Sequence, residues 1–72
     1  MERNCAVFKN VSRKVFDEVS DKMRHDPETR VPINIYYNGT DRRGTLTIEA
    51  SPGHNHEYKK ALRYVYDAFA NE

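Results

Sequence analysis

The stretch 31-VPINIYYNGTDRRGTLTIEA-50 decides the fold that this sequence predicts. It contains two runs in which apolar and polar residues alternate, and a polar connection containing Gly39 and Gly44 joins them. Within each run the apolar residues fall on one face: Val31, Ile33, Ile35 and Tyr37 in the first, and Leu46, Ile48 and Ala50 in the second. Alternation with a period of two over segments this short is typical of a half-buried β-hairpin.

The hairpin can be aligned so that every large apolar residue lies on the same face. We expect these pairs: Ile35 with Leu46, Ile33 with Ile48, and Val31 with Ala50. A slip by one residue would scatter the apolar side chains over both faces. Gly39 and Gly44 then lie in or beside the turn, with residues 40–43 at its tip. Pro32 has no N–H to donate to a neighbouring strand, so we expect the first run to begin an edge strand.

Helical spacing is visible on both sides of the hairpin. The first stripe consists of Phe8, Val11, Val15, Val19 and Met23, and the second of Tyr58, Ala61, Leu62, Val65 and Phe69. Asn10 or Ser12 is the expected cap of the first helix, and Ser51 or Asn55 of the second. The first helix is expected to end before Pro27, because proline disfavours helical geometry at the preceding residue.

Cys5–Phe8 fit either a short strand or the first turn of a longer helix. We favour the strand, because Asn10 and Ser12 begin helices better than they continue them. A two-stranded hairpin alone is marginally stable, so both helices are expected to cover its apolar face. The prediction is one α+β domain over residues 1–72. It is a two-layer sandwich of order (short β)-α-β-β-α, with two helices packed on one face of a small antiparallel sheet.

With that first strand, the order of elements resembles that of the DinI family, small bacterial and phage-borne modulators of the DNA-damage response. The resemblance is one of element order and spacing, and it spans nearly the whole chain. In that family the second helix is strongly acidic, whereas here it carries Lys59, Lys60 and Arg63. We therefore transfer no functional residue from that family.

The charges of the chain nearly cancel, with 12 Lys and Arg against 11 Asp and Glu and a net charge of +1. No global field is therefore expected to attract nucleic acid or an anionic membrane, and charge recognition must come from a local patch. The first residues, Met1–Asn4, lead into no long apolar run, so we expect neither a signal peptide nor a membrane span. We predict a cytoplasmic location.

His54, His56 and Glu57 form the most metal-like group of the sequence. A metal site needs three or four converging ligands, and the sequence gives no reason for Cys5 or His25 to approach this group. No nucleophile lies in a recognisable catalytic motif, and the glycines are isolated residues and not a phosphate-binding loop. We expect no metal, no cofactor and no enzymatic activity.

The remaining features favour a small regulator- or inhibitor-type module that binds another protein. Tyrosines near arginines are typical interface anchors, and unpaired sheet edges permit a homodimer. The expected contacts are Tyr36 with the outer sheet face, Arg42, Arg43, and Tyr64 with Lys60. The alternative is a small nucleic-acid-binding domain that uses Arg42, Arg43, Lys59, Lys60 and Arg63. On the second helix these basic residues are interleaved with Tyr64 and Tyr66, a pattern that can combine phosphate contact with base stacking.

Overall fold

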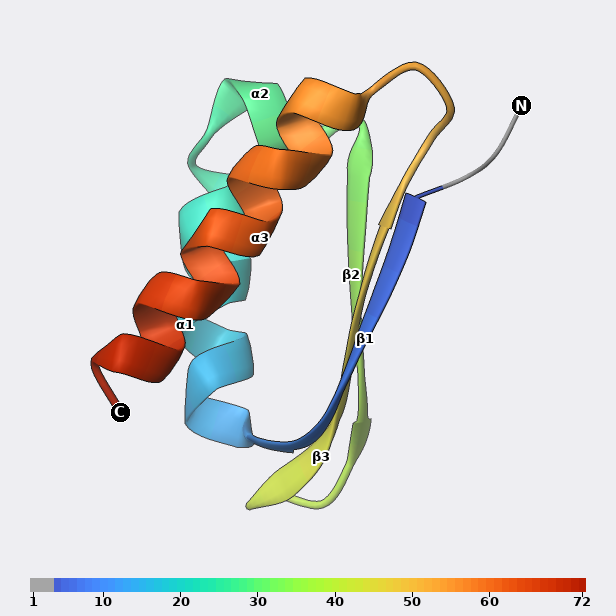
Figure 1. The fold of residues 1–72 in the computed structure, drawn as a ribbon. Helices are drawn as coiled ribbons and strands as arrows, with labels where there is room; N and C mark the ends of the chain where they lie inside the picture. The colour runs from blue at the N-terminus through green and yellow to red at the C-terminus, as the bar shows by residue number, and fades with distance from the viewer. Residues whose placement is uncertain (1–3) are drawn as a thin grey trace.

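The computed structural model describes residues 4–72 and arranges them in two layers. Its elements are β1 (Asn4–Ser12), α1 (Arg13–Arg24), α2 (Pro27–Arg30), β2 (Ile33–Gly39), β3 (Arg43–Ala50) and α3 (Asn55–Ala70). The strands form one antiparallel sheet in the order β1-β3-β2. The helices all lie on one face of this sheet, which confirms the predicted two-layer α+β fold (Figure 1). The expectation of no signal peptide was based partly on Met1–Arg3, and these three residues lie outside the described residues.

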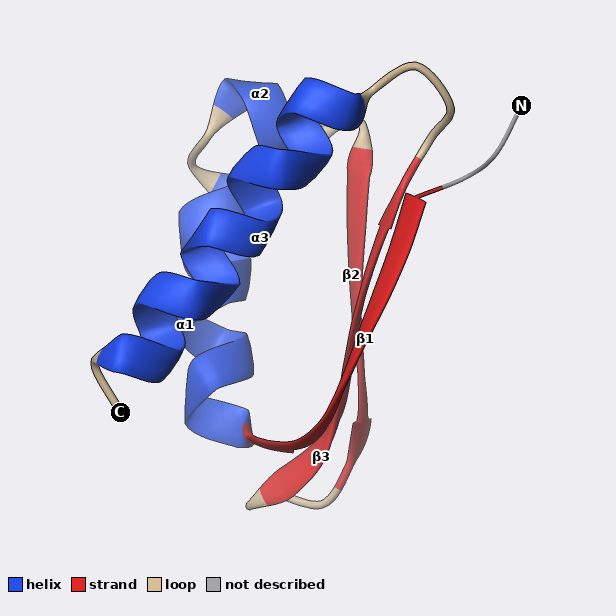
Figure 2. Cartoon of the chain, in the orientation of Figure 1, coloured by secondary structure: helices blue, strands red, loops and turns tan. Residues whose placement is uncertain are grey.

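The core lies between the inner face of the central strand and the two long helices. Leu46, Ile48 and Ala50 of β3 are fully buried there, together with Val19 of α1 and Val65 of α3. Burying a large aliphatic side chain stabilises a fold by about 1.5–3 kcal/mol. The burial of Leu46, Ile48 and Ala50 confirms the predicted inner face of the second hairpin strand. Figure 2 shows the separation of the helical layer from the strand layer.

Strand β1 is longer than expected. The structure confirms that Cys5–Phe8 form a strand, but this strand continues to Ser12, so the assignment of Phe8 and Val11 to the first helix was wrong. The register shifts between Phe8 and Val11, where Asn10 adopts a positive φ of 59°. Such a bulge inserts an extra residue and turns the next side chain to a new face, which lets Val11 reach the core.

Helix α1 begins directly after this strand. The Ser12 side chain accepts a hydrogen bond from the Val15 amide at 3.3 Å, so Ser12 is the cap that the sequence predicted as one of two candidates. Val15, Val19 and Met23 form the buried stripe of the helix, as the spacing indicated.

The hairpin register differs by two residues from the predicted one. The structure pairs Ile33 with Ala50, Ile35 with Ile48, and Tyr37 with Leu46. A shift by two keeps every side chain on its face. The position of the turn explains the shift: it is centred on Asp41 and Arg42, because the Thr40 amide donates to the Arg43 carbonyl at 2.9 Å and the Thr40 hydroxyl accepts hydrogen bonds from the amides of Arg42 and Arg43, both at 3.2 Å.

The two ends of the first run follow from this register. Gly39 faces Gly44, and a Cβ added to Gly39 would lie 2.3 Å from the Gly44 Cα, so the mouth of the turn needs glycine. At the other end, Val31 precedes the strand and is 77% exposed, so its expected pairing with Ala50 was wrong. Pro32 lies directly before β2, which is an edge strand, as predicted.

The segments around α2 and the start of α3 also differ from the prediction. The short helix α2 was not predicted; Asp26 caps it by accepting from the Glu28 amide at 3.0 Å, and Pro27 occupies its first turn. Helix α3 begins at Asn55 with His54 in the cap position, so neither Ser51 nor Asn55 caps it. The Ser51 amide instead donates to the Pro32 carbonyl at 3.3 Å, which extends the β2–β3 pairing.

Candidate functional site

The outer face of the sheet, opposite the helices, presents a row of three side chains across its strands. In the register, Val7 of β1 and Tyr36 of β2 both pair with Thr47 of the central strand. Val7 is 54% exposed and Tyr36 is 52% exposed. An aliphatic and an aromatic side chain therefore flank one threonine on a face that no helix of residues 4–72 covers (Figure 1).

The neighbouring positions on this face are polar. Two residues along the strands in one direction, Cys5, Glu49 and Asn34 form a second row on the same face. Two residues in the opposite direction, Thr45 pairs with Asn38. We call the three side chains Val7, Thr47 and Tyr36 the outer row. Tyr36 was predicted to lie here, whereas Val7 was missed because the pairing of β1 with β3 leaves no local signal in the sequence.

The hairpin tip carries the predicted Arg42 and Arg43, and both are exposed. The Arg43 guanidinium donates to the Asn10 carbonyl at 3.0 Å, and the Arg42 carbonyl accepts from the Arg13 amide at 2.9 Å. These bonds tie the turn to the bulge of β1 and to the start of α1. Of the two arginines, only Arg42 has a side chain without a hydrogen bond or ion pair to residues 4–72.

Tyr64 and Lys60, which were expected to contact a partner, bind within the chain. The Tyr64 hydroxyl donates to Asp26 Oδ2 at 2.5 Å, and Lys60 Nζ lies 2.8 Å from the same oxygen and 3.1 Å from Glu28 Oε1. Tyr64 also packs against the core. We call Asp26, Glu28, Lys60 and Tyr64 the polar clamp, since they join α2 to α3.

The electrostatics of the polar clamp favour its charged, hydrogen-bonded state. The hydrogen bond from Lys60, with a second from Tyr64, lowers the pKa of Asp26 to about 2. The same bond to Asp26 raises the pKa of Lys60, and the hydrogen bond to Asp26 raises the pKa of Tyr64. At neutral pH the carboxylate is ionised and both donors keep their protons. The arrangement therefore reads as structural.

The basic residues of α3 line a groove of about 330 Å³ with Glu28 and His56, and this groove shares Glu28 and Lys60 with the polar clamp. Lys59 and Arg63 are exposed there, while His56 Nε2 lies 3.5 Å from Glu28 Oε2. Lys59 lies in the first half of α3 and Arg63 near its middle, and this helix begins at the opposite end of the molecule from the hairpin tip (Figure 1). The cations of the nucleic-acid alternative therefore form two separate surfaces.

The remaining chemistry-bearing residues do not converge. His54 Nδ1 lies 3.6 Å from Glu57 Oε1, and Cys5 is an exposed free thiol. Among residues 4–72, no group of three His, Cys, Asp or Glu side chains is placed to hold a metal ion. In the same range, no helix combines the length and apolar character that crossing a membrane requires.

Comparisons of this chain with protein-family models, with curated proteins and with solved structures gave no match. The resemblance to the DinI family therefore remains one of element order. Function has to be argued from the surfaces just described.

Proposed function

We propose that this chain is a small, non-enzymatic, regulator- or inhibitor-type module of the cytoplasm that acts by binding another protein. The outer face of its sheet is the proposed docking surface. The observation that carries the proposal is the outer row, in which Val7 and Tyr36 are both more than half exposed on a face without a helix.

The chemistry of the outer row suits a protein partner. Protein interfaces enrich tyrosine at their centre and keep polar groups at the rim. Here Tyr36 and Val7 supply the apolar centre, and the polar positions of the neighbouring rows supply hydrogen-bonding groups. The hydrogen-bonded strands hold both side chains in place before binding, which reduces the entropy lost on association.

A nucleic-acid partner is less well supported by the same surfaces. Phosphate backbones are bound by continuous basic surfaces. Here the basic side chains do not form one continuous surface, because the hairpin tip and the basic part of α3 lie apart along the molecule. In addition, Lys60 and Arg43 are bonded within the chain. The outer row itself carries no charge.

The test is a comparison of two tyrosines with similar exposure on different layers. Tyr36 is 52% exposed on the sheet and Tyr66 is 57% exposed on α3. The wild-type chain, the Tyr36→Ser variant and the Tyr66→Ser variant are each used to capture proteins from cells that express the chain. The expected result is a protein that the wild type and Tyr66→Ser retain and that Tyr36→Ser loses. An identical set from all three, or retention abolished by nuclease, would contradict the proposal.

A second copy of the chain is one possible partner, since unpaired sheet edges and an open face permit a homodimer. Sedimentation velocity of the wild type over a range of concentrations separates this case. A dimer that Tyr36→Ser dissociates identifies the second copy as the occupant of the outer face. A monomer at high micromolar concentration assigns the face to a different protein.

A further inference from the structure

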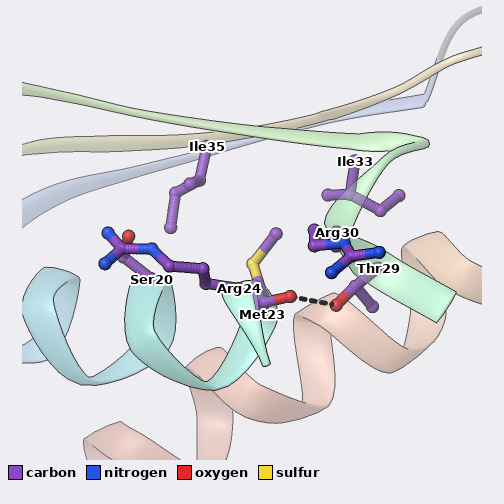
Figure 3. A pocket seen from close by; sticks show the side chains of 7 residues that line it. All are labelled: Ser20, Met23, Arg24, Thr29, Arg30, Ile33 and Ile35. Atoms are coloured by element: carbon purple, nitrogen blue, oxygen red, sulfur yellow. Dashed lines mark hydrogen bonds between the residues drawn. The ribbon is translucent and has the colours of Figure 1, made fainter. Parts of the chain in front are cut away.

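A hollow of about 190 Å³ lies between β2 and the helices beside it. Its lining is Ser20, Met23, Arg24, Thr29, Arg30, Ile33 and Ile35. Figure 3 shows Arg24 and Ser20 near Ile35, and Arg30 and Thr29 near Ile33. Thr29 is fully buried, and its hydroxyl donates to the Met23 carbonyl at 3.1 Å, which fixes α2 against the end of α1. The hollow thus has an apolar floor and an arginine toward each end.

The hollow runs beside an open edge of the sheet. Just beyond the two ends of β2, the Pro32 carbonyl accepts from the Ser51 amide and the Thr40 amide donates to the Arg43 carbonyl. Both pairs continue the β2–β3 register, so even-numbered residues of β2 are the ones bonded to β3. Because bonding alternates along an antiparallel strand, the N–H and C=O groups of Ile33, Ile35 and Tyr37 point to the open edge.

The other edge of the sheet is less suited to accept a strand. Strand β1 carries a bulge between Phe8 and Val11, with Lys9 and a positive-φ Asn10 inside it. Bulges and edge lysines are devices by which proteins discourage pairing at a sheet edge. The register of β2 with β3 is regular from Ile33 to Gly39. The β2 edge is therefore the better template for an added strand.

The charges around the hollow indicate what would bind there. Arg24 and Arg30 are exposed, and neither guanidinium has an ion pair or hydrogen bond to any residue from 4 to 72. Among the described residues, no carboxylate lines the hollow. An occupant that supplies carboxylates would pair with both arginines. Strand β2, with the sequence INIYYNG, carries no carboxylate, so edge-to-edge pairing with a second copy of β2 would not supply one from that strand.

We propose that the β2 edge binds an extended acidic segment of another protein as an additional strand. Residues of that segment that bond to Ile33 and Ile35 would present their side chains on the helix side of the sheet, as Ile33 and Ile35 do. One aliphatic side chain would enter the hollow, and Asp or Glu two positions away would pair with Arg24 or Arg30. The expected motif is acidic–x–aliphatic–x–acidic. This proposal concerns a different surface from the outer row and does not rest on it.

The first test uses the synthetic peptide Thr-Glu-Thr-Leu-Thr-Glu-Thr and amide hydrogen exchange followed by NMR. In the free protein the amides of Ile33, Ile35 and Tyr37 should exchange fast, and those of Asn34 and Tyr36 slowly. The peptide should protect the three fast amides. The same peptide with an N-methylated leucine should fail to protect them, because it lacks the central N–H donor. Absence of binding at millimolar peptide, or shifts confined to the outer face, would overturn the proposal.

The second test measures the peptide affinity of charge variants. Arg24→Gln and Arg30→Gln should each weaken binding about threefold to fivefold, the size expected for one exposed ion pair. Lys14→Gln, on the exposed side of α1, and Tyr66→Ser, on α3, are matched controls that should bind as the wild type does. Replacing both peptide glutamates by lysine should abolish binding. Unchanged affinity in both Arg24→Gln and Arg30→Gln contradicts the acidic motif. Protection of the β2 edge that appears without peptide as the protein concentration rises would assign this edge to a second copy.

Discussion

The two ends of this small molecule are stabilised by different kinds of interaction, aromatic contacts at one end and charged hydrogen bonds at the other. Near the hairpin turn, the rings of Phe16 and Tyr37 lie 5.0 Å apart, and the Arg13 guanidinium lies 5.5 Å from each ring centre. The Tyr37 hydroxyl also donates to the Val11 carbonyl at 3.0 Å. At the other end, the polar clamp joins α2 to α3 through the carboxylate of Asp26.

This difference indicates which end of the molecule should lose stability when the pH changes. The aromatic end is stabilised by ring contacts and by a neutral hydrogen bond, so changes in pH near and below neutrality should affect it little. The polar clamp depends chiefly on the ionised carboxylate of Asp26, which is only 9% exposed. A change of charge at Asp26 affects its bonds to Tyr64, to Lys60 and to the Glu28 amide, and leaves only the pair between Lys60 and Glu28. The predictions below separate the two ends, beginning with the largest effect.

Removing the ring at the aromatic end should have the largest effect. Tyr37→Ala is expected to lower the free energy of unfolding by about 2–3 kcal/mol, below the usual cost for a fully buried ring because Tyr37 is half-buried. Tyr36→Ala, one residue earlier on the outer face, should cost less than about 1 kcal/mol. Urea unfolding followed by circular dichroism measures both. Equal losses would show that the ring contacts of Tyr37 contribute nothing.

Removing the Asp26 carboxylate from the polar clamp should have the next largest effect. Asp26→Ala deletes the cap of α2 and leaves Lys60 and Tyr64 without their shared acceptor. The melting temperature should fall by several degrees, as measured by thermal unfolding at neutral pH. Asp67→Ala is the matched control, because Asp67 is exposed on α3. Melting of both variants at the same temperature would contradict the role of the clamp.

Acid should weaken the polar end alone. The pKa of Asp26 is lowered from 3.8 to about 2 by folding, so its contribution to stability is complete above pH 3.8. This contribution declines as the pH falls and is lost once the pH passes through about 2. The difference in unfolding free energy between the wild type and Asp26→Asn should therefore shrink over this window. The difference between the wild type and Tyr37→Phe should stay constant, and a parallel decline of the two would refute the assignment.

The two tyrosine hydroxyls should show the smallest effects and still differ. Tyr64→Phe removes a hydrogen bond to a carboxylate and should cost about 1 kcal/mol, a reduced value for a half-buried donor. Tyr37→Phe removes a hydrogen bond to a neutral carbonyl and should cost about 0.5 kcal/mol. Chemical unfolding at pH 7 in matched buffers gives both values. The reverse order would mean that the carboxylate adds no strength to the Tyr64 bond.

The sequence predicted the layers well because alternation and helical spacing are local signals. The faces of β2 and β3 were correct even though the register was two residues off, since a shift by two preserves the side of every residue. Phe8 and Val11 were placed in a helix because their spacing from Val15 is also helical. Only the pairing of β1 with β3 reveals that they belong to a strand. The four residues of α2 are too few to show a period.

The surfaces were less predictable because they depend on contacts between distant segments. Tyr64 and Asp26 are 38 residues apart, and nothing near either residue indicates their hydrogen bond. The sequence could not single out Arg24 and Arg30, because the hollow that they line forms only when β2 packs beside α1 and α2. Tyr36 was placed correctly on the outer face, since strand alternation alone determines its side. Whether Tyr36, Arg42 and Arg43 bind a partner stays a prediction.

The central place of β3 also constrains when the chain can fold. Both β1 and β2 pair only with β3, and β1 reaches it across the whole of α1, α2 and β2, since Asn4 pairs with Ala50. A nascent chain that ends before Arg43 therefore has two strands and no sheet. During synthesis Val11, Val15 and Val19 cannot be buried in the core until residues 43–50 have been made, because β3 supplies the central part of that core. Pairings so distant in sequence close slowly, and we expect the β2–β3 hairpin to form first and β1 to join it last.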